Sequence, residues 1–87
     1  NLDIKHILEV MHLLKKLVEE QSKTIILVVH DINIASTFAD YIVAMKNGEI
    51  IESGLTEDII NNEILYKIYE INFQIENFKN KKICLYY

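Results

Sequence analysis

His30 and Asp31 follow directly on five apolar residues, 25–29. Such a run, with helical patterns before and after it, is typical of a central parallel strand covered on both faces. In open α/β sheets, ligands bind outside the carboxyl ends of the strands. The pattern therefore makes His30 the first candidate for a functional site. The alternative is a histidine that only caps the strand end by bonding nearby backbone.

Other polar residues have structural explanations at hand. Asp31 and Asp3 each stand where an N-cap would stand before a helical pattern. His6 and His12 are six residues apart, about 120° around a helix, unlike the i, i+4 pair that binds zinc. No metal site is therefore predicted. Cys84 is the only cysteine, which excludes an internal disulfide, and it lies in an alternating strand pattern where a buried, non-catalytic role is favoured.

Length and composition limit the class of protein. The 87 residues allow one domain, and 51% hydrophobic with 25% charged residues favours a globular chain over a disordered one. The net charge is -4, so no partner nucleic acid is expected. The longest apolar run, 25–29, is far shorter than the roughly 20 residues of a membrane span. We expect a soluble, cytoplasmic chain, with Lys79, Lys81 and Lys82 in a solvated turn.

The periodicity of the first half predicts three elements that position these residues. Apolar residues recur at helical spacing after Asp3, and β-branched residues dominate the run that follows. The expected order is a helix over 4–20, a strand over 24–29 and a short helix over 32–39. His30 would then lie between the strand and the second helix.

The second half predicts two hairpins and two short helices. Asn47 and Gly48 are typical of a type I′ turn, because both central residues of that turn need positive φ. The expected elements are a hairpin of 41–45 and 49–52, a short helical turn capped by Thr56, a helix opened by Asn61 or Asn62, and a terminal hairpin of 73–76 and 83–87.

The ordered motifs resemble one family. Asn1-Leu2-Asp3, the segment ILVVHDINIASTFADYIVAMKNGEIIESG and the sequence TEDII after it are similar to the carboxyl-terminal third of an ABC transporter ATPase. In that family the D-loop tail reads Leu-Asp, a switch (H-loop) histidine ends a core strand, and a Gly-Glu/Lys-Ile hairpin ends in Gly. The resemblance covers residues 1–71. His-Asp-Ile-Asn with the following Ala35 is most similar to ATPases of iron-siderophore, haem and cobalamin importers.

The resemblance implies a fold class and a domain assignment. The expected fold is α/β, the C-terminal portion of a P-loop NTPase core. Only Gly48 and Gly54 are present, so the chain cannot contain Gly-x-x-x-x-Gly-Lys-Ser/Thr, and the Walker B and signature motifs are absent too. We therefore expect residues 1–87 to be a fragment of the ATPase domain, from the D-loop tail to the C-terminus.

The resemblance also implies residue roles. His30 would contact the γ-phosphate of ATP, because phosphoryl transfer is catalysed mainly by positioning and by donors that stabilise charge on the phosphate oxygens. Asp3 would belong to the D-loop that couples two nucleotide sites, while also capping its helix. ATP and Mg²⁺ are the expected cofactors of the parent protein, and none is expected for the fragment alone.

Partners and location follow from the same resemblance. The parent would pair with a second ATPase subunit as a homodimer and with membrane permease subunits, at the inner face of the cell membrane. The parent would couple ATP hydrolysis to uptake of an iron-siderophore-type substrate, and the fragment would be inactive alone. Its strand 24–29 would lack a neighbour, so we expect self-association through that edge or by exchange of the first helix.

A second hypothesis belongs to a different class. The chain would be a free-standing, non-enzymatic α/β interaction module, in which a histidine at a strand end is incidental. A phosphate-binding loop encoded upstream of Asn1 would favour the ATPase hypothesis, whereas a reading frame beginning at Asn1 would favour the module.

Overall fold

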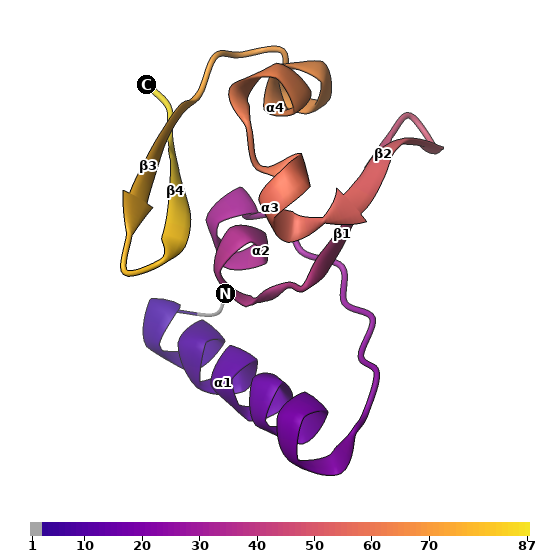
Figure 1. Ribbon diagram of the computed structural model, residues 1–87, viewed down its shortest axis with the longest axis vertical. Coiled ribbons are helices and arrows are strands. Elements are labelled where there is room, and N and C mark those ends of the chain that lie inside the picture. Colours follow the sequence, from indigo (N-terminus) through magenta and orange to yellow (C-terminus); the bar gives the residue numbers. More distant parts are fainter. Residues whose placement is uncertain (1–2) are drawn as a thin grey trace.

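A computed structural model describes residues 3–87, and Figure 1 shows their arrangement. The chain order is α1 (Ile4–Gln21), α2 (Ile32–Phe38), β1 (Tyr41–Lys46), β2 (Glu49–Leu55), α3 (Thr56–Ile59), α4 (Asn62–Tyr69), β3 (Gln74–Phe78) and β4 (Lys81–Leu85). Helix α2 lies at the centre, with the β3–β4 hairpin beside it and α1 extending away from the rest. Asn1 and Leu2, part of the D-loop resemblance, lie outside the described residues.

Helix α1 begins and ends where the sequence predicts, within one residue. The Asp3 carboxylate accepts from the His6 N–H at 2.8 Å, which confirms Asp3 as the N-cap. Ser22 closes the helix in the left-handed region, at φ 52°. The helix contains no fully buried residue, so most of its apolar stripe is at best half-covered within this part of the chain.

Helix α1 is attached to the rest mainly at one place. The Lys15 ammonium lies 3.0 Å from an Asp40 carboxylate oxygen and donates to the Phe38 carbonyl at 3.3 Å. The His12 ring meets the Phe38 ring edge to face, with centroids 5.2 Å apart. His12 is exposed but makes this contact.

The predicted strand over 24–29 is wrong for this chain. Residues 22–29 form neither helix nor strand, and they connect α1 to α2 along the outside of the molecule. A β-strand exists only through its ladder to a neighbour. All four described strands pair within their own hairpins, β1 with β2 and β3 with β4, and none of them pairs with this segment.

The β1–β2 hairpin forms around the predicted turn. Asn47 has φ 53° and Gly48 has φ 78°, the positive values that a type I′ turn needs. The strands are antiparallel and extend a few residues beyond the predicted bounds, to Leu55. A register shift after Ala44 marks a β-bulge.

The two short helices follow, with one correction. Thr56 does not cap α3, because the preceding residue Leu55 holds the N-cap position without a side-chain bond. The Thr56 hydroxyl instead donates to the Ala39 carbonyl at 2.6 Å. Asn61 caps α4 as predicted, accepting from the Ile64 N–H at 2.9 Å.

The terminal hairpin closes a small core. Strands β3 and β4 are antiparallel and turn at Lys79 and Asn80, both with positive φ. Four buried residues pack together: Ile60 just after α3, Leu65 of α4, Phe73 just before β3 and Cys84 of β4. The mixed α/β fold with two antiparallel hairpins agrees with the predicted class, although its strands form two separate two-stranded sheets.

Candidate functional site

His30 lies in a bend immediately before α2. Its side chain is exposed, and within the described residues no side-chain hydrogen bond involves the imidazole. The next residue, Asp31, caps α2 as predicted: its carboxylate accepts from Asn33 N–H at 2.8 Å and Ile34 N–H at 3.3 Å. The imidazole is therefore presented at the capped end of a helix and is available to an external acceptor.

Helix α2 is fixed to strand β4 by side chains. The Asn33 amide donates to the Cys84 carbonyl at 3.1 Å, and its oxygen accepts from the Cys84 N–H at 2.7 Å. One turn later, the Ser36 hydroxyl donates to the Lys82 carbonyl at 2.6 Å. These three bonds join segments about 50 residues apart in sequence, and the sequence did not predict them. Figure 1 shows α2 and β4 close to each other.

The charge of Asp31 affects a buried thiol and a partly exposed phenol. Burial raises the pKa of the Cys84 thiol above its ordinary value, and the Asp31 carboxylate raises it further. Burial and then Asp31 raise the pKa of the Tyr69 phenol in the same way. Tyr69 contacts Phe73 and Phe73 contacts Tyr86, each with ring centroids 5.4 Å apart. This environment keeps the thiol protonated and gives no support for a thiolate nucleophile.

The two predicted site residues are not joined to each other. Asp3 is at the start of α1 and is exposed, like His30 at the start of α2. No hydrogen bond or ion pair between them occurs in the described part of the chain. The coupling role implied for Asp3 acts between two subunits, so it stays a prediction.

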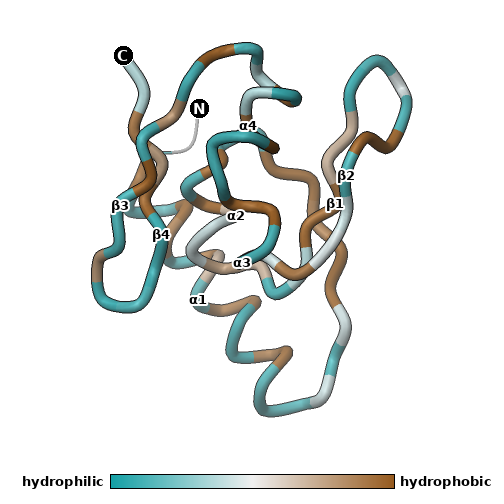
Figure 2. The backbone as a smooth tube through the Cα atoms, turned by 45° about the horizontal axis from the view of Figure 1, so that its top comes forward, coloured by the Kyte–Doolittle hydropathy of each residue, from teal (hydrophilic) through white to brown (hydrophobic). Residues whose placement is uncertain are grey.

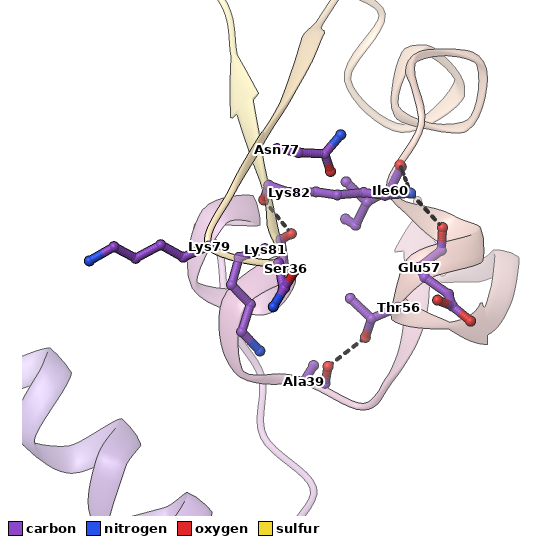
Figure 3. A pocket seen from close by; sticks show the side chains of 10 residues that line it. Ser36, Ala39, Thr56, Glu57, Ile60, Asn77, Lys79, Lys81 and Lys82 are labelled. Carbon is purple, nitrogen blue, oxygen red and sulfur yellow. Dashed lines mark hydrogen bonds between the residues drawn. The ribbon is translucent and has the colours of Figure 1, made fainter.

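A pocket of about 590 Å³ lies at the other end of α2. It is lined by the end of α2, by α3 and by the β3–β4 turn, with Ser36 and Thr56 on its walls (Figure 3). Lys82, predicted in a solvated turn, is instead half-buried there and donates to Glu57 O at 3.0 Å and Ile60 O at 3.5 Å. His30 does not line this pocket, so the pocket gives no support to the predicted site.

Residues 3–87 contain neither a cluster of metal-binding side chains nor a membrane-spanning helix. No group of three or more histidine, cysteine or acidic side chains is arranged to hold a metal ion there. None of the described helices has the length and apolarity that crossing a membrane requires.

The chain is similar in sequence to importer ATP-binding proteins. It is 49% identical over 87 residues to the petrobactin import ATP-binding protein YclP of Bacillus subtilis, covering 100% of this chain and 34% of that protein. It is 38% identical to the iron(3+)-hydroxamate import ATP-binding protein FhuC of the same organism, covering 99% of this chain and 33% of that protein. The chain thus spans about a third of the length of these relatives.

The fold agrees with the sequence comparison. A solved structure of a metal-chelate type ABC transporter in an inward-facing conformation matches with a TM-score of 0.80 and 22% identity, over 98% of this chain and 36% of the other. No protein-family model matches the chain. Over its whole length the chain therefore matches the carboxyl-terminal part of siderophore-import ABC transporter ATP-binding proteins, which confirms the resemblance found in the sequence.

Proposed function

We propose that these residues are the C-terminal part of the ATP-binding subunit of an ABC importer that takes up an iron-siderophore-type substrate. The observation that carries this proposal is the 49% identity over all 87 residues to a petrobactin import ATP-binding protein. The proposed domain assignment runs from the D-loop tail at Asp3 to the C-terminus. The phosphate-binding loop and Walker B residues would lie in the remainder of the subunit, since residues 1–87 do not contain them.

In this proposal His30 is the H-loop histidine. Its imidazole is exposed at a capped helix end, where its N–H can donate to a γ-phosphate oxygen brought by the remainder of the subunit. ATP supplies the phosphoryl group, and Mg²⁺ offsets the phosphate charge when both are bound. Asp31 is occupied with two backbone N–H groups, so we assign it to capping rather than to nucleotide contact.

Asp3 and the partners complete the proposal. Asp3 caps α1 and would lie at the interface with a second ATPase subunit, where the D-loop couples two nucleotide sites. Permease subunits in the cell membrane would hold the ATPase pair on the cytoplasmic side. The transported substrate is set by those subunits, and the siderophore class is proposed from the names of the relatives.

The test is ATP turnover by the complete subunit carrying His30→Ala. Loss of one preorganised donor to the transferring group typically costs about 2.7–4 kcal/mol at the barrier, or roughly 100- to 1,000-fold in kcat. We expect that loss with ATP affinity much less affected. His6→Ala is the matched control, because His6 is an exposed histidine on α1, and it should leave turnover unchanged. Wild-type turnover in His30→Ala would reduce His30 to a structural residue.

The isolated 87-residue chain provides a second test. Backbone N–H groups and a lysine of the phosphate-binding loop supply most nucleotide contacts in P-loop proteins. The chain alone should therefore neither bind nor hydrolyse ATP. Calorimetry showing micromolar ATP affinity for residues 1–87 would contradict the domain assignment.

A further inference from the structure

Asn33 lies three residues after His30, on the first turn of α2, and bonds on both sides of its amide to one residue of β4. We propose that Asn33 is a positioning residue: by fastening the start of α2 to Cys84, it fixes where the His30 imidazole is presented. The inference rests on the proposed function of His30. The proposal also gives the β3–β4 hairpin a role, because this hairpin holds the start of α2, and with it His30, in place.

The geometry of β4 explains why this attachment is specific. In an antiparallel pair the backbone groups of alternate residues point to the partner strand and away from it. The carbonyls of Lys82 and Cys84, two residues apart, both accept from α2, so this edge of β4 faces the helix while the other edge pairs with β3. Asn33 thus occupies the place of a neighbouring strand at Cys84.

The chemistry of the side chain is equally specific. Cys84 offers one N–H donor and one C=O acceptor, and a primary amide presents a matching acceptor and donor side by side without any change of protonation. Asparagine satisfies both groups at 2.7 and 3.1 Å. An aspartate could accept from the N–H but would place a carboxylate against the Cys84 carbonyl.

A continuous series of bonds connects β4 to the residue beside His30. Cys84 holds the Asn33 side chain, and the Asn33 backbone N–H in turn donates to the Asp31 carboxylate at 2.8 Å. Asp31 is covalently bonded to His30. On the other side of His30, residues 22–29 form no strand and make no ladder bonds in the described chain. Within residues 3–87, the hydrogen bonds that reach the neighbour of His30 therefore come from the helix side.

Steady-state turnover of the complete subunit tests the proposal. Misplacing a catalytic group by about 1 Å can cost roughly a hundredfold in rate. We expect Asn33→Ala to lower kcat about ten- to a hundredfold, with the KM for ATP nearly unchanged, and Asn33→Asp, which would turn a carboxylate oxygen toward the Cys84 carbonyl, to lower kcat at least as much. Asn77→Ala, an exposed asparagine on β3 of the same hairpin, is the matched control and should leave kcat unchanged.

The double variant separates positioning from general stability. If Asn33 acts through His30, then His30→Ala with Asn33→Ala should turn over no more slowly than His30→Ala alone, because residues that act as a unit are non-additive. Multiplicative losses in the double variant would overturn the proposal. Wild-type kcat in Asn33→Ala beside a slow His30→Ala would also overturn it, while leaving the proposed function of His30 standing. Wild-type kcat in His30→Ala would instead remove the proposed function.

Cys84 supplies a reporter that does not depend on activity. Its thiol is the only one in the chain and is 1% exposed, behind the segment that Asn33 holds. We expect Asn33→Ala to label with a thiol reagent at least about tenfold faster than wild type in the 87-residue chain, because loss of two bonds favours local opening. Equal labelling rates for Asn33→Ala, Asn77→Ala and wild type would contradict the proposed attachment.

Discussion

Thr56 donates its side-chain hydroxyl to the Ala39 carbonyl at 2.6 Å (Figure 3), and its backbone N–H donates to the Asp40 carbonyl at 3.1 Å. Asp40 stands immediately before β1, and Thr56 immediately after β2. The two bonds therefore close the base of the β1–β2 hairpin against the end of α2. This closure fixes how the hairpin leaves the centre of the molecule.

Replacement of Thr56 by valine tests this closure. Valine has nearly the same shape but no hydroxyl, so the half-buried Ala39 carbonyl would lose its partner. An unsatisfied group of this kind typically costs about 1–3 kcal/mol. We expect the free energy of unfolding from urea titration to fall by that amount in Thr56→Val. Thr56→Ser, which keeps the hydroxyl, should lose less than half as much, and equal losses would assign the effect to packing.

Stability should fall at alkaline pH because of the buried Cys84 thiol and, to a smaller extent, the partly exposed Tyr69 phenol. Burial, with the Asp31 charge, raises the pKa of the Cys84 thiol and of the Tyr69 phenol in the folded chain. A raised pKa gives stability that is complete below the unfolded-state pKa and is lost as pH rises through the folded-state pKa. The loss of stability caused by the Cys84 thiol should begin at about pH 8.5, the pKa of a free cysteine.

Chemical denaturation between pH 7 and 10 measures this slope. Cys84→Ala removes the titrating thiol, so its free energy of unfolding should decline less steeply with pH, whatever its value at pH 7. An unchanged slope in Cys84→Ala would assign the alkaline loss to Tyr69 or to other groups.

Asp31 has two separable effects, capping and charge. Asp31→Asn keeps an oxygen for the Asn33 and Ile34 N–H groups but removes the charge, so the Cys84 pKa should fall toward its ordinary value with little loss of stability. Asp31→Ala removes the cap as well and should cost about 1 kcal/mol. The NMR chemical shift of the Cys84 Cβ carbon, followed against pH, gives the thiol pKa in the folded chain. A similar loss of stability in both variants would show that the charge, not the cap, stabilises α2.

Self-association of the isolated chain remains a prediction. Because residues 24–29 form no strand, we now expect exposed apolar side chains, rather than a strand edge, to cause it. Ile26 is 93% and Val28 is 82% exposed in the connection after α1, which Figure 2 shows as a hydrophobic stretch. Contiguous exposed apolar residues favour association with another copy. We expect light scattering to report a dimer or larger species at high micromolar concentration, and Ile26→Lys with Val28→Lys to shift it toward monomer. A wild-type monomer under these conditions would contradict the prediction.

Local signals predicted most of the elements. Helix α1 follows from its apolar spacing and from Asp3, and the β1–β2 turn follows from Asn47 and Gly48, because caps and turns are decided by a few adjacent residues. The strand 24–29 failed for the opposite reason. Its β-branched composition indicates a buried strand, but a ladder depends on a neighbour that local composition does not report.

The candidate site shows the same division. His30 and the Asp31 cap could be identified from sequence order, since both depend on the start of one helix. The bonds from Asn33 to Cys84 join residues 51 apart in sequence, and no periodicity reports such a contact. The sequence shows Asn33 as a polar residue in the first turn of α2, but only the fold shows that its partner is Cys84.

Helix α1 has a consequence for cooperativity. It has no fully buried residue, and its recorded polar and aromatic contacts with the rest are those of Lys15 and His12 with Phe38 and Asp40. Most of the stability of a helix in a protein comes from packing of its apolar face, and no residue of α1 is fully buried. Its melting is therefore weakly coupled to that of the core around Leu65, and the chain should absorb heat over two steps, the helix first, rather than in one two-state transition.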